Sequence, residues 1–501
     1  MAADVSSVEV SGRTFILTDR PSALFKNGRR NTNKPTFLDL TTSEAAGDLV
    51  IGRFALLWQY RRHFAPEDQC NAGVYFENSC SMNDARFTEL AHSLSPTRPI
   101  RTPEFLRGRA VDLVKIQREL QHFHASVFIY GFRGVGKTSL ARTAAQLVNS
   151  SEFEHVYVAC APGSRMLHIV REIGEEMLKA LFRLGAIETI RKQVEIEVSL
   201  SPAIKASFEK AQAALPEFTD VNGAVSVLKD LDSLFPETTN IVAILDELEE
   251  LETTDRTDLA YIIKQIGDQE FKTRFVFVGI ASNVHELIGA HASVPRYIKE
   301  VSLDPLYPQN LMDIVSEAAT AVSVDIDRNI LIRIAIIGNG YPHFAHLLGQ
   351  SLLIEAIERD AYVVTDEIYM AGVEKAVEDS KEELKSSYEA ATQRGQDYFR
   401  HLIWALADSD VVDLRIDEWI SAYKVLTDRM NLSEADETKL RTAIGNFNKE
   451  SYGSIIMNTP AAYGSATIRY RYKRFSDTLM RGHVRLQAEK AKVKLGRQVT
   501  A

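Results

Sequence analysis

The sequence predicts an α/β fold in which helices cover both faces of a parallel sheet, followed by a helical domain and a C-terminal domain of helices and a β-hairpin. Three observations lead to this prediction. Short apolar runs, among them residues 126–130, 240–245 and 274–280, alternate with amphipathic helical patterns. From about residue 323 the pattern is helical only. Beyond residue 385, three helical segments precede two extended ones, which is the order of a winged helix.

The composition is that of a folded globular protein. Of 501 residues, 45% are hydrophobic and 25% are charged, so a sizeable core is expected. We find no run of about 18 apolar residues and no secretory signal, and therefore expect no membrane partner. The three cysteines, Cys70, Cys80 and Cys160, show neither a disulfide framework nor paired zinc spacing. A reducing, cytoplasmic setting is expected.

The distribution of charge is uneven along the chain. The formal net charge of −10 argues against a protein whose whole surface coats nucleic acid. The segment from Thr467 to Ala501 differs, because it holds ten Lys/Arg and only two Asp/Glu. This basic end is a local indication of an anionic partner.

These patterns divide the chain into four predicted parts. The Pro-punctuated stretch 93–103 is typical of a linker. We therefore expect an N-terminal region of unassigned role and partial disorder at 1–98, and an α/β core at 99–322. A helical lid is expected at 323–384, and a winged-helix domain with a basic tail at 385–501.

A glycine-rich motif opens the first helix after the first apolar run. Residues 131–138, GFRGVGKT, match the pattern G-x-x-x-x-G-K-[ST], which cradles nucleotide phosphates with backbone N–H groups and a helix N-terminus. Lys137 would reach the β- and γ-phosphates, and Thr138 would place its hydroxyl on Mg²⁺. The alternative is an ordinary glycine-rich turn. The predicted phosphate-binding residues are Gly131, Arg133, Gly134, Val135, Gly136, Lys137, Thr138 and Ser139.

An acidic pair ends the apolar strand at 240–245. Because the carboxyl ends of parallel strands meet at one edge of the sheet, Asp246 and Glu247 are expected beside the glycine-rich loop. Asp246 would hold Mg²⁺, and Glu247 would orient and polarise the attacking water. The alternative is that the pair caps the next helix, and Glu249 and Glu250 are expected on a solvated face.

A further polar residue follows the next apolar strand. Asn283, or with less support Ser282, would sit between the two motifs and contact the γ-phosphate or the water. Asn283 is equally suited to be the N-cap of the following helix.

Together these features resemble an AAA+-type P-loop ATPase, closest to the initiator-like and STAND-related branches, over about residues 100–490. The resemblance implies ATP and Mg²⁺ as cofactors and adenine packing against Phe105, Gly108 and Arg109, although this segment also suits a simple basic turn. It implies an arginine acting across a subunit interface, for which Arg296 is the candidate, with a lone surface arginine as the alternative. Where such lids often carry an arginine, this sequence has Pro342, followed by His343.

The last extended segment, 468–473, alternates between apolar and cationic residues. Its two predicted faces consist of Ile468, Tyr470 and Tyr472, and of Arg469, Arg471 and Lys473. A cationic face beside aromatic residues suits contact with the phosphates of duplex DNA. A solvated face, or a contact between this hairpin and the nucleotide, would use the same residues.

We therefore expect an ATPase that binds and hydrolyses ATP to drive a conformational or assembly switch, acting with DNA. A homo-oligomer or a protein partner is also expected. One alternative is a STAND-like signalling or defence switch that oligomerises with ATP and recruits a protein effector. The other is an ATP-binding scaffold with little turnover.

Overall fold

The computed structural model describes most of the chain beyond residue 72 and four short strands before it. The described residues are 6–10, 13–17, 37–38, 54–55, 73–100, 102–123, 125–148, 155–183, 215–236, 241–281, 294–393, 396–460 and 468–496. They fall into two compact units, Met1–Ser81 and Met82–Ala501. Among the described helices, none is long and apolar enough to cross a lipid bilayer.

The first unit contains two short antiparallel strand pairs. β1 (Ser6–Val10) pairs with β2 (Arg13–Leu17), and β3 (Phe37–Leu38) pairs with β4 (Phe54–Ala55). The helix α1 (Gly73–Ser93) begins in this unit and ends in the second. There the buried Arg86 donates to Val322 O at 3.0 Å, so the end of α1 belongs to the core of the second unit.

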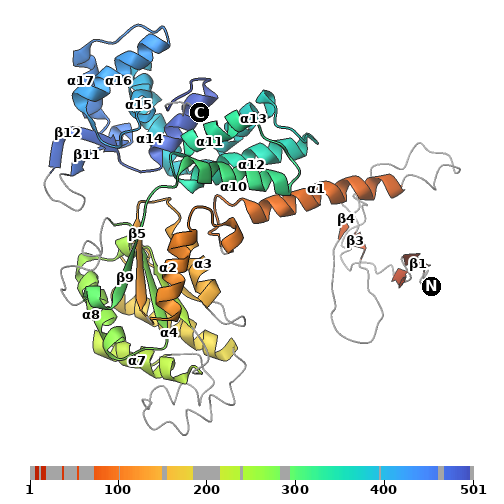
Figure 1. Cartoon of the computed structure of the whole chain (residues 1–501), viewed down its shortest axis with the longest axis vertical. Coiled ribbons are helices and arrows are strands. Elements are labelled where there is room, and N and C mark those ends of the chain that lie inside the picture. The colour runs from red at the N-terminus through yellow and green to blue at the C-terminus, as the bar shows by residue number, and fades with distance from the viewer. Residues whose placement is uncertain are drawn as a thin grey trace, which may run out of the picture. The chain divides into compact units, whose positions relative to one another are not determined.

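A five-stranded parallel sheet is the centre of the first half of the second unit (Figure 1). Its strands lie in the order β6-β7-β8-β5-β9. Their bounds are β5 (Ser126–Gly131), β6 (Val156–Ala159), β7 (Val242–Asp246), β8 (Arg274–Gly279) and β9 (Ile298–Leu303). All five residues of β7 are buried, as expected for a strand covered on both faces.

Helices cover both faces of this sheet. They are α2 (Ala110–Gln121), α3 (Lys137–Val148), α4 (Met166–Arg183), α7 (Val221–Leu234) and α8 (Thr253–Asp268), with the 3-10 turns η1 (Pro103–Phe105), η2 (Leu248–Glu250) and η3 (Val294–Arg296). Val127 and Ile129 of β5 belong to the hydrophobic cluster of α2 and α3. Phe128, between them, belongs to the cluster of α4, α7 and α8. The predicted α/β class with an αβα parallel sheet is thus confirmed.

A purely helical region, α10 to α13, follows β9. Its helices are α10 (Pro308–Ala321), α11 (Arg328–Gly338), α12 (Pro342–Glu358) and α13 (Asp366–Glu378). The Asp327 side chain accepts from Asn329 N–H at 2.8 Å and so starts α11. Asn339 in the left-handed conformation ends it, and Pro342 then begins α12, where its missing N–H costs no helix hydrogen bond.

The C-terminal region runs from α14 to α18. It comprises α14 (Glu382–Gln393), α15 (Asp397–Asp408), β10 (Leu414–Arg415), α16 (Ile416–Arg429), α17 (Glu437–Asn446), η4 (Glu450–Tyr452), β11 (Ile456–Pro460), β12 (Ile468–Phe475) and α18 (Met480–Lys490). β12 lies between β10 and β11 in an antiparallel sheet. The fully buried Trp419 and Tyr423 of α16 contribute to its core.

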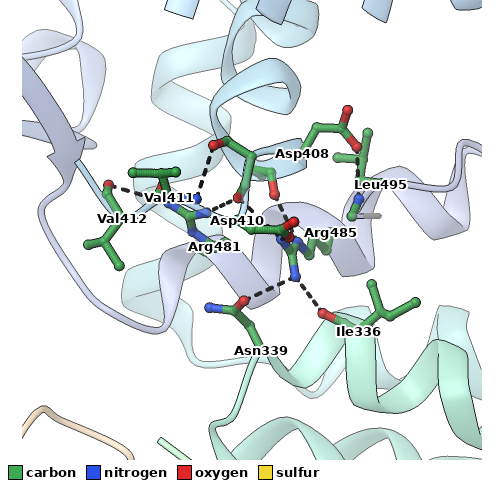
Figure 2. A network of polar contacts seen from close by, with 12 residues as sticks. Ile336, Asn339, Asp408, Asp410, Val411, Val412, Arg481, Arg485 and Leu495 are labelled. Carbon is green, nitrogen blue, oxygen red and sulfur yellow. Dashed lines mark hydrogen bonds and ion pairs between the residues drawn. The ribbon is translucent and has the colours of Figure 1, made fainter. Parts of the chain in front are cut away.

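Two buried arginines of α18 connect the C-terminal region to the α10–α13 region. Figure 2 shows Arg481 and Arg485 directed from α18 toward the segment after α15 and toward the end of α11. Arg485 donates to Ala407 O at 2.8 Å and to Ile336 O at 2.6 Å. Arg481 donates to Val411 O at 2.8 Å. Because each guanidinium satisfies carbonyls that end or follow other helices, α18 fixes the mutual position of α11 and α15.

The strand β12 does not have the alternation that the sequence predicted. Its register with β11 shifts between Asn458 and Thr459, and such a shift breaks the period of two along a strand. Lys473 is buried and donates to Asn458, whereas Tyr470 is 70% exposed. The predicted position of Lys473 on an outer cationic face is therefore wrong.

Candidate nucleotide-binding site

The loop between β5 and α3 has a backbone conformation that its glycines permit. Gly134 and Gly136 have φ angles of 83° and 96°, in the left-handed region that side chains rarely adopt. A Cβ atom at Gly134 would lie 2.6 Å from Leu479 Cδ2, so the C-terminal region lies directly against the loop. At Gly136 the nearest described atom would be Pro342 Cγ, at 3.9 Å, which leaves the loop open toward α12.

The ammonium group of Lys137 lies inside this loop. It donates to Gly131 O at 3.1 Å and to Phe132 O at 3.0 Å. Desolvation lowers the pKa of Lys137 to about 8, against the opposing charges of Glu249 and Asp246. Because the hydrogen bonds that this buried ammonium makes to described residues go to neutral carbonyls, it is well suited to receive an anion.

Thr138 and Asp246 meet at the carboxyl edge of the sheet. Thr138 Oγ1 donates to Asp246 Oδ2 at 2.7 Å, and the Tyr157 hydroxyl donates to the same oxygen at 3.1 Å. Asp246 is buried, with 3% of its surface exposed. Desolvation and the charge of Asp246 raise the pKa of Tyr157 to about 12, which keeps this phenol a hydrogen-bond donor.

Glu247 follows Asp246 in an unusual backbone conformation. Its φ of 59° and ψ of 41° are left-handed, and its N–H donates to Asp246 Oδ1 at 2.9 Å. The side chain is exposed to the cavity described below. Desolvation raises the pKa of Glu247, and the charges of Asp246 and Glu249 add to this shift. A non-glycine residue held in this conformation at a strand end is typical of a functional site.

Glu249 differs from its predicted place on a solvated face. Its Oε2 accepts from Ile280 N–H at 2.8 Å, next to the end of β8, and the side chain lines the same cavity. The 3-10 turn η2 causes the difference, because it directs Glu249 back toward the sheet edge.

A cavity of about 320 Å³ joins these groups. The predicted residues that line it are Phe105, Arg109, Arg133, Gly134, Val135, Gly136, Lys137, Thr138, Ser139, Asp246, Glu247 and Pro342. They come from the segment before α2, from the loop, from the end of β7 and from the start of α12. The structure therefore brings twelve of the predicted residues together around one space.

Arg109 and Ser139 also hold the walls of the cavity in place. Arg109 donates to Val135 O at 2.9 Å and to Asp304 O at 2.7 Å, which ties the loop to the end of β9. Burial lowers the pKa of Arg109, and Asp112 opposes the shift. Ser139 Oγ accepts from Ile100 N–H at 3.1 Å.

Arg133 connects the loop to the C-terminal region. Its guanidinium lies 3.4 Å from Asp477 Oδ2 and 3.7 Å from Glu383 Oε2. Its carbonyl accepts from the Thr478 hydroxyl at 3.1 Å. Since the Arg133 side chain is about half exposed, these ion pairs position it without binding it strongly.

The comparison with family models decides the family of this chain. The model of Novel STAND NTPase 1 (nSTAND1) matches residues 100–443, well over half of the chain. The chain belongs to the nSTAND1 family. This confirms the predicted resemblance to a P-loop NTPase of the STAND-related branch. No curated protein matches the chain.

Several solved structures are similar in fold to this nSTAND1 protein. They include the Walker-type ATPase PABY2304 of Pyrococcus abyssi, with 15% identity over 78% of this chain and 99% of that chain and a TM-score of 0.45. Cdc6p from Pyrobaculum aerophilum has 14% identity over 80% and 98%, with a TM-score of 0.39. The ORC2 protein of Aeropyrum pernix, in ADPNP–ADP complexes, has 15% identity over 80% and 98%, with a TM-score of 0.41.

Several predicted residues of the nSTAND1 protein are not among those around the cavity. Gly131 does not line it, although its carbonyl accepts from Lys137. Asn283, like Ser282, lies outside the described residues. Arg296 is exposed at the end of η3 and does not line the cavity.

The groups at the sheet edge fit a hydrated magnesium ion. Mg²⁺ is usually held by one or two protein oxygens together with phosphates and water. The Thr138 hydroxyl and the Asp246 carboxylate supply such oxygens 2.7 Å apart. The described part of the chain, this edge included, holds no group of three or more His, Cys, Asp or Glu that could bind a metal ion by itself.

Sequence reasoning missed several residues of this site, among them three with polar side chains. Tyr157 and Glu249 contact the acidic end of the sheet, and Lys381 lines the cavity from the start of α14. Tyr157 had a usable signal, because its strand ends at the same sheet edge as Asp246. Lys381 had none, since its position depends on how the helices beyond α13 return to the loop.

Proposed function

We propose that this nSTAND1 protein binds ATP with Mg²⁺, hydrolyses it, and uses the cycle as a conformational or assembly switch. The observation that supports this most is the arrangement of Lys137, Thr138, Asp246 and Glu247 around one cavity. Family membership supports nucleotide binding, and the acidic strand end supports hydrolysis.

Each residue has a proposed task in binding. The loop from Gly131 to Ser139 surrounds the phosphates, with Lys137 at the β- and γ-phosphates. Thr138 and Asp246 hold Mg²⁺, which neutralises charge on the phosphate oxygens when bound. Phe105, Arg109 and Pro342 face the base and ribose.

Glu247 is the proposed general base. Its raised pKa makes it a better acceptor for the proton of the attacking water than an ordinary carboxylate. Asn283 would orient the same water or the γ-phosphate. Arg296 would act across an interface with a second copy, which is consistent with its exposure at η3.

The test of hydrolysis is Glu247→Gln. ATP turnover is expected to fall about 10²–10⁴-fold while ATP binding persists, because only the proton acceptor is lost. Glu250→Gln, in the same acidic run but away from the cavity, is the matched control and is expected to retain turnover. Lys137→Ala is expected to lose binding itself. Normal turnover in Glu247→Gln would refute the assignment.

The proposed switch rests on where the cavity walls come from. We infer the four parts predicted above: an N-terminal region at 1–98, a core at 99–322, a lid at 323–384 and a winged-helix domain at 385–501. Pro342 from the lid and Lys381 at its junction with the C-terminal region line the cavity with the core, so a bound nucleotide would contact both sides. The molar mass and hydrodynamic radius with ADP and with a non-hydrolysable ATP analogue should therefore differ. Identical values in both states would contradict a switch.

Duplex DNA is a second candidate partner. Arg469 and Arg471 are exposed on β12 beside the exposed Tyr470, an arrangement that suits phosphate contact. Salt-dependent DNA binding should be lost in Arg469→Glu/Arg471→Glu and retained in Lys424→Glu, an exposed lysine of α16. If the unmodified chain did not bind DNA at low salt, the partner would not be DNA, and the alternative of a signalling switch that recruits a protein effector would be favoured.

A further inference from the structure

Lys381 lines the nucleotide cavity although it belongs neither to the sheet nor to helices α10 to α13. It immediately precedes α14 (Glu382–Gln393) and lines the cavity together with Lys137, Glu247 and His343. It is thus the residue through which the beginning of the C-terminal region reaches the candidate site.

The backbone at Lys381 is firmly held. Its carbonyl accepts from Leu384 N–H at 3.0 Å and from Lys385 N–H at 3.2 Å. The preceding Ser380 is buried, and its hydroxyl donates to Ala376 O at 2.8 Å. The root of the side chain is therefore fixed, while the residue is exposed and lines the cavity.

Helix stability does not explain a lysine at this position. The residue before a helix is best Asn, Asp, Ser or Thr, and a positive charge there opposes the helix dipole. Within the described part of the chain, the Lys381 ammonium forms no hydrogen bond and no ion pair. Its charge is thus available to a group that enters the cavity.

The residues that share the cavity lining with Lys381 place it at the phosphate end, because Lys137, Thr138 and Glu247 are among them. Partial burial lowers its pKa, and the nearby Arg133 adds to this shift. The opposing charges are those of Asp477, Glu383 and Glu247, and Glu247 is the carboxylate proposed to act on the attacking water. Of the described residues of α12, Pro342, His343 and His346 line the cavity, and desolvation lowers the pKa of both histidines to about 4, so that all three are neutral. Lys381 is therefore the cation that this side of the cavity offers to a terminal phosphate.

We propose that Lys381 binds the γ-phosphate of ATP and makes the site distinguish ATP from ADP. This rests on the proposed function, because it requires a nucleotide in the cavity. Lys381 then also transmits the loss of that phosphate to the C-terminal region, since it is anchored at the first turn of α14.

Calorimetric titration with a non-hydrolysable ATP analogue and with ADP, both with Mg²⁺, tests the proposal. Lys381→Ser removes the charge and supplies a better N-cap, so the variant is expected to fold at least as well. The analogue should bind about ten-fold more weakly and ADP within about two-fold of the unmodified chain, as for one lost charge-assisted contact. Lys381→Arg should retain most of the affinity.

The matched control is Lys385→Ser. Lys385 lies one turn further along α14 and pairs with Glu382 at 2.8 Å, away from the cavity. Its loss should leave both affinities unchanged. The proposal would be overturned if Lys381→Ser weakened the binding of the analogue and of ADP equally, or weakened neither. Loss of binding in Lys137→Ala would show, in the same series, that the nucleotide binds in this cavity. If the unmodified chain bound neither nucleotide, the proposed function itself would fail and the role of Lys381 with it.

Discussion

Replacing Arg333 of α11 with methionine is expected to destabilise the junction of α11 and α18 by about 3–5 kcal/mol. Arg333 and Glu489 of α18 form a buried ion pair whose side chains are 8% and 4% exposed. Arg333 also donates to Leu495 O at 3.2 Å, and the Tyr369 hydroxyl donates to Glu489 Oε1 at 3.0 Å. In Arg333→Met the carboxylate stays buried with Tyr369 as its remaining donor, and uncompensated burial of a charge is the main cost.

The double variant Arg333→Met/Glu489→Leu separates the charge from the packing. Because both ions are removed, the remaining loss is the unpaired Tyr369 hydroxyl and Leu495 carbonyl, about 1–3 kcal/mol. The free energy of unfolding in urea can be followed by tryptophan fluorescence, since Trp404 and Trp419 are buried in the C-terminal region. A loss in free energy of unfolding below about 1 kcal/mol for Arg333→Met would show that the pair is effectively hydrated. The same would follow if the double variant lost as much as the two single variants together.

Three further predictions concern stability. Gly134→Ala should lower the free energy of unfolding in urea by about 1–3 kcal/mol, because the new Cβ would lie 2.6 Å from Leu479 Cδ2 on a backbone with φ of 83°. Adding Leu479→Ala should recover the part of this loss that comes from the steric clash, but not the part that comes from the backbone conformation. Arg485→Lys should lower the free energy of unfolding by about 1–3 kcal/mol, since one ammonium cannot reach both carbonyls that the guanidinium spans; an unchanged melting temperature would contradict this. Desolvation lowers the pKa of His346 and of His483 to about 4, so below pH 6.5 the unfolded chain binds more protons than the folded one. Stability should therefore fall between pH 6.5 and 4 by about 1.4 kcal/mol per unit for each histidine, and His483→Leu should reduce the slope by its share.

The parts of the site that the sequence predicted are those whose geometry is local. The spacing of the glycines and the lysine in the loop from Gly131 to Thr138 is sufficient to predict phosphate binding. Asp246 and Glu247 follow from one strand, because a parallel sheet places strand ends at one edge. These residues need no knowledge of how the rest of the chain folds.

The parts that the sequence could not predict depend on tertiary contacts or on register. Lys381 reaches the cavity only because the chain returns from α13 to the loop. Lys473 is buried because the ladder of β11 and β12 slips at Asn458, which no alternation of residue types reveals. Glu249 faces the sheet because a single 3-10 turn follows β7.

The contact between the loop and the segment 477–479 has a thermodynamic consequence. Leu479 packs on Gly134 on one side of the loop, while Lys137 faces the cavity on the other. If a nucleotide in the cavity changes the free energy of the contact between Leu479 and Gly134, then breaking that contact changes the free energy of nucleotide binding by the same amount. A partner that lifts this segment off the loop would thus change nucleotide affinity by the same factor by which the nucleotide changes the affinity for that partner. The two affinities, measured separately, would give one coupling free energy.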